Sequence, residues 1–345
     1  MGAQSGRFVI SLDFELYWGI RHMPWAAHYM PNLVGARKAI PDLLAMFSRY
    51  ATHATWATVG FLFFENTPSL LKMIPQVRPE YRDKRFSPYL ALPPQDAFET
   101  PDSVFFGASL IRAIAATPDQ EVATHTFSHY YCLEEGQHLQ AFRADLDAAR
   151  AAARVFGLEL RSLVFPQNQC RPDFLQACWE AGIIAYRGNP QLWLYRAASE
   201  EDQGYVRRLG RLMDAYMPVN RWGCQPPPAA DTGRPINVVA TQFLRPYSPR
   251  FRSLEPLRLR RIKAQMTAAA KEGLMYHLWW HPHNFGVHTE HNLAFVKEIL
   301  EHYRILHERY GFESRNMYEI AAEALGSSLQ SREPDRSNGF PEARA

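Results

Sequence analysis

Cysteine is scarce in this chain, and its placement excludes one class of protein. Only four of the 345 residues are cysteine, at positions 132, 170, 178 and 224, and none of them forms a CxxC pair. Small disulfide-stabilised domains contain many more cysteines per residue, because their hydrophobic cores are too small to hold them folded. We therefore expect reduced structural cysteines, or at most one loose pair, and no disulfide framework.

Long apolar runs and a large net charge are also absent. No stretch approaches the length of a transmembrane helix, and residues 1–7 lack the basic and apolar regions of a signal peptide. We therefore expect a cytoplasmic protein without a membrane span. The formal net charge is only +3, which gives no argument for a nucleic-acid partner.

What the chain does contain is an alternation of short apolar strands and amphipathic helices. Strands are predicted at 7–12, 54–60, 121–124, 160–165, 183–187, 236–241 and 274–280. Helices are predicted at 34–50, 104–116, 136–156, 172–181, 257–272 and 292–310, and 21–33 is predicted as a loop. This order is typical of a parallel sheet with crossover helices, either closed into a barrel or open. No glycine-rich phosphate loop follows the first strand, which disfavours an open nucleotide-binding sheet.

The length of the chain allows one large barrel or two modest domains. We predict one barrel domain over residues 1–326. Long insertions interrupt it near 75–101, where prolines and charges are frequent, and near 189–235, where the periodicity is poor. Residues 327–345 are polar and are predicted to form a disordered tail.

A pair of histidines carries the clearest chemical signal. His125 and His129 are four residues apart, directly after a predicted strand. On one helical turn they would point the same way, so both imidazoles would reach one metal ion. The alternative is a pair of histidines at a helix start that bind backbone carbonyls, with Thr126 and Ser128 as capping residues.

An acidic pair near the N-terminus is the best source of a third ligand. Asp13 and Glu15 are two residues apart at the end of the first strand, so they would face the same side. Two neighbouring carboxylates are unfavourable unless a cation lies beside them. One acid would therefore bind the metal and the other would take a proton. The alternative is a solvated Glu15, or a salt bridge between one of the acids and Arg21.

His281 ends the last predicted strand and is placed to act as a general acid, because imidazole titrates near neutral pH. His283 competes for this role, and a purely structural histidine is the alternative. Asp13, His125, Pro166 and His281 all fall at the carboxyl ends of predicted strands, which meet at one rim of an α/β barrel. This coincidence favours a metal-dependent amide hydrolase with its active site on that rim.

Four segments also carry a resemblance to a known family. They are the acids of 11–15, the histidines of 125–129, the strand end of 164–168 with Pro166, and the segment 278–282 with His281. In this order they match the first, second, third and fifth motifs of the polysaccharide deacetylases. The chain therefore resembles this family, also called NodB-homology domains or family 4 carbohydrate esterases, from residue 8 to about residue 286.

The resemblance implies a deformed (β/α)7 TIM-like barrel and a divalent metal, usually zinc. The implied metal ligands are one carboxylate and two imidazoles, those of Glu15, His125 and His129. Asp13 would be the general base, His281 the general acid, and the backbone N–H of Gln167 would help to form an oxyanion hole. The implied reaction removes an N-acetyl or similar acyl group from a sugar or glycan precursor, which is the expected substrate.

The sequence departs from the family pattern in three places. Phe14 separates the two acids, where many members have adjacent aspartates. Phe165 stands where an arginine commonly precedes the proline of the third motif. The fourth motif, in which an arginine orients the base, has no clear match, and Arg187 and Trp193 are the candidates.

Other functions remain open. Two histidines and a carboxylate also suit non-haem Fe(II), although the barrel rim favours hydrolysis. A related hydrolase would open C–N bonds in small amides or ureides, sometimes without a metal. A non-catalytic glycan-binding relative would keep the barrel, but the intact acids and histidines argue against it.

Aromatic side chains are candidates for stacking on sugar rings. They are Tyr17, Trp18, Trp25, Trp193, Trp222, Trp279 and Trp280. Most of them are expected to fill the core. Because side chains alternate across a strand, one of Trp279 and Trp280 should do so.

Overall fold

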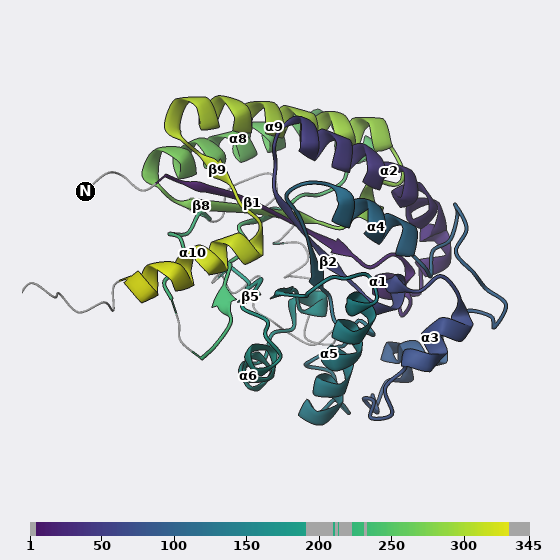
Figure 1. Cartoon of the computed structure of the whole chain (residues 1–345). Coiled ribbons are helices and arrows are strands. Elements are labelled where there is room, and N and C mark those ends of the chain that lie inside the picture. Colours follow the sequence, from purple (N-terminus) through teal and green to yellow (C-terminus); the bar gives the residue numbers. More distant parts are fainter. Residues whose placement is uncertain (1–4, 191–209, 211–212, 214–222, 231–232, 331–345) are drawn as a thin grey trace, which may run out of the picture.

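A parallel sheet forms the centre of the molecule (Figure 1). The computed structural model describes residues 5–190, 210, 213, 223–230 and 233–330. Within them the sheet contains nine strands, β1 (Arg7–Phe14), β2 (Ala54–Thr58), β3 (Gln120–Thr124), β4 (Ser162–Leu163), β5 (Ala185–Tyr186), β6 (Ile236–Asn237), β7 (Gln242–Phe243), β8 (Met275–Trp280) and β9 (Glu313–Ser314). All pairings between these strands are parallel.

One continuous segment links the two ends of the sheet. The strand order is β6-β5-β4-β3-β2-β1-β8-β7, with β9 beside β1. In the segment 236–244, the N–H groups of Ile236 and Val238 donate to carbonyls at β5, whereas those of Thr241 and Leu244 donate to carbonyls of β8. The sheet therefore closes into a barrel of seven strand positions, one of which β6 and β7 share.

Helices surround this barrel. The α-helices among the described residues are α1 (Tyr17–Ile20), α2 (Met30–Arg49), α3 (Thr67–Met73), α4 (Ala108–Ala116), α5 (Leu139–Arg154), α6 (Pro172–Glu180), α8 (Glu255–Glu272), α9 (Thr289–Tyr310) and α10 (Met317–Gln330). The short 3-10 helices are η1 (Ala26–Tyr29), η2 (Gly60–Phe63), η3 (Lys84–Phe86), η4 (Pro88–Leu90), η5 (Pro166–Asn168), η7 (Pro249–Leu254) and η8 (Pro282–Phe285). Figure 1 shows α2, α8 and α9 together on one side of the sheet, with α5 and α6 on another. Among the described helices, none is both long and apolar enough to cross a membrane.

The two faces of the strands have different neighbours. Outward-facing side chains such as Leu12, Trp56 and Trp280 are fully buried in the large core beneath the helices. The inward-facing side chains form a second apolar cluster with α10. Its members are Val9, Ala57, Val164, Ala185, Ile236, Val238, Met275, Met317, Ile320 and Ala321. Helix α10 therefore closes the end of the barrel where the strands begin, and the other end remains for a site.

The structure differs from the sequence-based prediction in several elements, and it contains α1, α3, β7 and β9 where no helix or strand was predicted. The predicted loop 21–33 contains η1 and the start of α2, because Pro31 occupies the first turn of the helix, where its missing N–H costs no hydrogen bond. Helix α10 was not predicted, and it extends to Gln330, inside the predicted tail; residues 331–345 lie outside the described part. In the insertion 75–101 only η3 and η4 are regular, and most of 189–235 is not described.

Candidate active site

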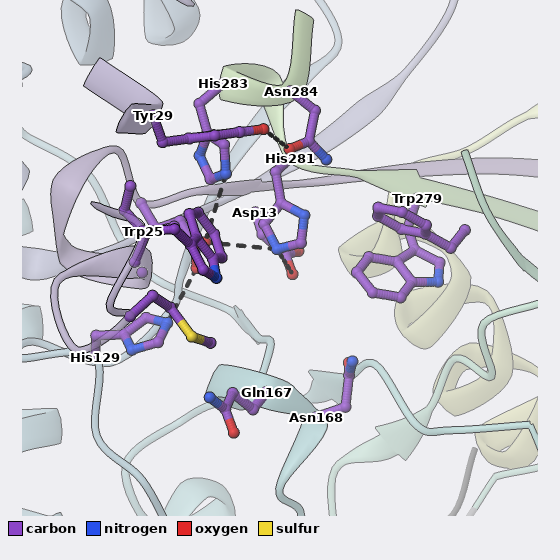
Figure 2. A pocket seen from close by; sticks show the side chains of 15 residues that line it. Asp13, Trp25, Tyr29, His129, Gln167, Asn168, Trp279, His281, His283 and Asn284 are labelled. Carbon is purple, nitrogen blue, oxygen red and sulfur yellow. Dashed lines mark hydrogen bonds and ion pairs between the residues drawn. The ribbon is translucent and has the colours of Figure 1, made fainter. Parts of the chain in front are cut away.

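The predicted site residues meet at the carboxyl end of the barrel. Asp13 is near the end of β1, Glu15 follows that strand, His125 follows β3 directly, and His281 follows β8. A cavity of about 470 Å³ opens beside them and is lined by both acids and by His281 (Figure 2). This volume is within the range of small-molecule binding sites.

The Glu15 carboxylate is at the centre of the site. Its Oε2 atom lies 3.2 Å from Nε2 of His125 and 3.0 Å from Nε2 of His129. The three residues are buried, and their ligand atoms lie within 4.8 Å of one another. They form a group that could hold a metal ion. The alternative partner, Arg21, instead donates to the carbonyls of Trp18 and Phe86.

The hydrogen bonds of His125 suit a metal ligand. Its Nδ1 lies 2.8 Å from the carbonyl oxygen of Val164. A carbonyl can only accept, so Nδ1 carries the proton, and Nε2 of the neutral ring presents a lone pair to the Glu15 carboxylate. Two electron-rich atoms 3.2 Å apart need a cation between them. A metal ion held by both residues meets this need, as would a second proton on the ring.

His129 is the second imidazole of the group. Burial lowers its pKa to about 4, with the Glu15 carboxylate acting in the opposite direction, so the ring is neutral at pH 7. Its Nδ1 lies 3.4 Å from a guanidinium nitrogen of Arg21, which can only donate. As placed, Nε2–H therefore donates to Glu15, and the ring must change to the tautomer with its proton on Nδ1 if Nε2 is to bind a metal.

The segment that carries both histidines is an irregular turn, so the predicted helical turn over 125–129 is wrong. Thr126 and His129 have φ angles of 63° and 56°. The carbonyls of Thr126 and Phe127 accept hydrogen bonds from the N–H groups of Gly60 and Phe61 in η2. Because these carbonyls are bound to η2, they are not available for the bonds of a helix.

Backbone strain is concentrated around this site. Eight non-glycine residues in the described part of the chain have positive φ, and five of them border the site. They are Leu16, Thr126, His129, Gln167 and Asn168. Each such residue costs about 1–3 kcal/mol and persists only where its surroundings hold it. The strained backbone at these positions therefore lowers the stability of the fold, and it sets the direction of side chains at the rim.

A glycine makes room for the central carboxylate. Gly19, in α1, lies so close to Glu15 that a Cβ atom at position 19 would overlap the carboxylate oxygens. Gly19 was not predicted as part of the site, because its close approach to Glu15 depends on how α1 folds back over the end of β1.

Arg187 holds the second acid of the pair. Its two terminal nitrogens lie 2.6 and 2.7 Å from the two oxygens of Asp13. Burial raises the pKa of Asp13, but the Arg187 guanidinium and nearby imidazoles outweigh it, so the pKa lies below its ordinary value. Arg187 follows β5, stacks 4.0 Å from the Trp279 ring and also donates to Asn168. The other candidate, Trp193, lies outside the described residues.

Of the two histidines after β8, His281 is the one that faces both acids. Its Nε2 lies 3.5 Å from Glu15 and 3.7 Å from Asp13, and its side chain is 24% exposed. His283 is buried, and its Nε2 lies 4.0 Å from Glu15. Burial lowers the pKa of His283 to about 3. Only His281 combines contact with both acids and exposure to the cavity.

Gln167 borders the cavity from the opposite side. It has a φ of 51° and follows Pro166, which begins η5 after β4. Among the described residues no acceptor binds its backbone N–H. Figure 2 shows Gln167 and Asn168 across the cavity from His283 and Asn284. Because Gln167 lines the cavity, its N–H is a candidate donor to a ligand there.

Aromatic side chains flank the same cavity. Trp25 and Trp279 lie on opposite sides of Asp13 and His281 (Figure 2). Trp280 is fully buried, which agrees with the predicted alternation across the strand, and Trp18 also belongs to the core. Trp193 and Trp222 lie outside the described residues.

Comparisons with known proteins give a match in fold. No family model matches the sequence, and no curated protein is similar to it in sequence. A solved structure from Mycobacterium smegmatis, assigned as a polysaccharide deacetylase, aligns with 99% of this chain and 96% of its own, with a TM-score of 0.60 and 14% identity. A second such assignment, from Pseudomonas aeruginosa PAO1, covers 95% and 92% with a TM-score of 0.52 and 12% identity.

A third solved structure has a different printed activity. The Puue allantoinase aligns with 95% of this chain and 91% of its own, with a TM-score of 0.52 and 10% identity. At these identities the likeness shows the fold and not the reaction. The chain has a deformed (β/α)7 barrel of the polysaccharide deacetylase type, and the predicted fold class is confirmed.

Proposed function

We propose that this protein is a metal-dependent hydrolase that removes an N-acetyl or similar acyl group from a sugar or glycan precursor. One observation carries the proposal. A single cavity brings together a buried Glu-His-His group, a carboxylate held by an arginine, and a partly exposed histidine. Metal-dependent hydrolysis of an amide uses these three parts: a Lewis acid, a base and an acid.

Glu15, His125 and His129 would hold the metal, and two nitrogen ligands with one carboxylate suit zinc. A zinc ion bound there supplies Lewis acidity, which polarises a carbonyl and makes water more acidic. The Val164 carbonyl on Nδ1 of His125 holds that ring in the tautomer a ligand needs. The same three ligands also suit Fe(II), so the metal must be identified by measurement.

The remaining residues would transfer protons or stabilise the charge that develops on the substrate. Asp13 would take a proton from the attacking water, with Arg187 fixing the direction of both its oxygens. The N–H of Gln167 would stabilise the negative charge that develops on the acyl oxygen. His281 would donate a proton from Nε2 to the leaving nitrogen. Water thus adds to the acyl carbon, the C–N bond breaks, and acetate and a free amine result.

The walls of the cavity support a ring-shaped substrate. Trp25 and Trp279 line the cavity on two sides, and aromatic faces stack well on sugar rings. Trp25 is 45% exposed, whereas the Arg187 guanidinium already covers one face of Trp279. Two solved structures with this fold are assigned as polysaccharide deacetylases. The modest cavity volume and the fold of the allantoinase favour a second candidate, hydrolysis of a small amide or ureide.

The experiment has two parts. Zinc and iron content are measured in the purified protein, in the double variant His125→Ala, His129→Ala, and in a His291→Ala control that removes an exposed histidine of α9. The proposal predicts a metal in the wild type and the control and its loss from the double variant. Equal metal in all three proteins ends the ligand assignment.

The second part measures turnover. Acetate release from a panel of N-acetylated sugars is compared with hydrolysis of allantoin. Asp13→Asn should keep the metal and lose turnover, because the amide cannot take a proton from water. Retained turnover would remove Asp13 as the base, and activity on allantoin alone would select the second candidate.

A further inference from the structure

A buried aspartate outside the cavity binds the turn that carries the two histidines. Asp145 lies in α5 and is 1% exposed. Its Oδ1 accepts the backbone N–H of Phe127 at 2.6 Å, and its Oδ2 accepts the backbone N–H of Ser128 at 3.1 Å. The Ser128 hydroxyl also donates to Oδ2. One carboxylate therefore satisfies three donors of the turn.

The turn is fixed from two sides. On one side η2 donates to the carbonyls of Thr126 and Phe127, and on the other side Asp145 accepts from the next two N–H groups. These N–H groups are buried, so without an acceptor they would be unsatisfied. The turn also contains two positive φ angles, which need support from their surroundings. Hydrogen bonds to a carboxylate are among the strongest that a protein offers.

We infer that Asp145 is a positioning residue for the metal site, and that through the turn it sets the placement of His125 and His129 against Glu15. This inference rests on the proposed function, because it assumes that these three residues hold a metal. Burial raises the pKa of Asp145 to about 7, and the three donors act in the opposite direction. The measurements are therefore made at pH 8, where the carboxylate form is favoured.

The test compares Asp145→Asn with the matched control Asp147→Asn. Asp147 is on the same helix, but its side chain is 71% exposed and pairs with Arg150. Zinc affinity of the folded proteins is measured by competition with a chelator, and unfolding of the metal-free proteins is measured in urea. In Asp145→Asn an amide NH₂ replaces one acceptor and faces a backbone N–H. Changes in groups that support metal ligands typically weaken metal binding about 10- to 100-fold.

We expect zinc affinity to fall at least tenfold in Asp145→Asn and to stay unchanged in Asp147→Asn. A folded Asp145→Asn protein with wild-type zinc affinity would overturn the inference, even if urea unfolds it more easily, because the role would then be structural only. If Asp145→Asn does not fold, zinc binding by Ser128→Ala, which removes one of the three donors to Asp145, is the test of the inference. Weaker zinc binding in Ser128→Ala supports the inference, and unchanged binding overturns it. A wild-type protein that binds no zinc or other divalent metal defeats the proposed function itself.

Discussion

The two ends of the barrel contain different kinds of buried side chain, apolar at one end and charged or polar at the other. Where the strands begin, α10 covers an apolar cluster of side chains such as Val9, Val238 and Ile320. Where the strands end, buried acids, imidazoles and a guanidinium meet on strained backbone. Apolar burial stabilises the fold directly, whereas each buried charge costs stability unless a partner offsets it. The difference indicates that one end holds the barrel together and the other is available for chemistry.

Buried or partly buried carboxylates at the two ends show the same contrast. Near α10, Glu121 accepts from the Thr55 hydroxyl and the Tyr318 N–H, and burial raises its pKa. At the rim, Asp13 is held by Arg187 and its pKa lies below its ordinary value. The carboxyl near α10 therefore keeps its proton to a higher pH than usual, whereas the Asp13 carboxyl loses its proton at a lower pH than usual.

The largest effect should come from breaking the buried ion pair at the rim. Arg187→Ala leaves the buried Asp13 without its main charged partner, and such a change costs about 3–5 kcal/mol of stability. Turnover should also be lost, because the base is no longer oriented. Urea unfolding and acetate release measure the two effects. Lys263→Ala, which breaks an exposed pair with Glu298, is the control and should cost less than about 1 kcal/mol. Equal losses in the two variants would contradict the account.

Shortening a buried side chain at the opposite end should lower the stability of the fold without changing zinc affinity. Ile320→Ala removes a buried side chain beneath the barrel and should cost about 2–4 kcal/mol. Zinc affinity of the folded protein should not change, because the site is at the other end. The exposed Ile305→Ala in α9 is the control and should be nearly neutral. A loss of zinc affinity in Ile320→Ala would show that the two ends are coupled.

Gly19→Ala tests the space around the central carboxylate. The new methyl group would overlap Glu15, so the carboxylate must move. Overpacking of this kind costs about 1–3 kcal/mol, and we expect at least tenfold weaker zinc binding. Gly326→Ala in α10, where nothing lies within 4 Å of the added atom, is the control and should be neutral or slightly stabilising. Native zinc affinity in Gly19→Ala would show that the carboxylate is not held there.

The smallest effect concerns Glu121 and depends on pH. Burial raises its pKa above the ordinary value of 4.5, so the folded protein keeps the proton to a higher pH than the unfolded chain does. The stability of the wild type therefore falls as the pH rises from 4.5 through the raised pKa. Glu121→Gln removes that cost and stays within about 1 kcal/mol of the wild type. The variant should gain relative to the wild type as the pH rises above 4.5, measured by urea unfolding at several pH values. A constant or opposite difference would contradict the raised pKa.

Most of the elements and the rim were predictable because they depend on local pattern. Apolar runs gave the strands, and the position of a residue just after a run placed Asp13, His125 and His281 at one end. Arg187 was only a candidate, since its contact with Asp13 spans 174 residues. The turn at 125–129 was predicted as helical, because the spacing of two histidines does not reveal that η2 binds its carbonyls.

Other features left no mark in the local sequence. Gly19 acts through the turn that brings it against Glu15, four residues earlier, and Asp145 acts through hydrogen bonds to residues 17 and 18 positions earlier. Neither residue stands out from its neighbours in the chain. Helix α10 follows the short strand β9, and its role as the cover of the barrel depends on the inward-facing residues of other strands.

The most direct test of the account is a crystal structure of the zinc-loaded protein with data collected at the zinc absorption edge. We expect one strong anomalous peak about 2.0–2.2 Å from a carboxylate oxygen of Glu15 and from Nε2 of His125 and His129. Asp13 should remain paired with Arg187 beside the peak. A fully loaded crystal with no peak among these three residues, or with the zinc bound elsewhere, would contradict it.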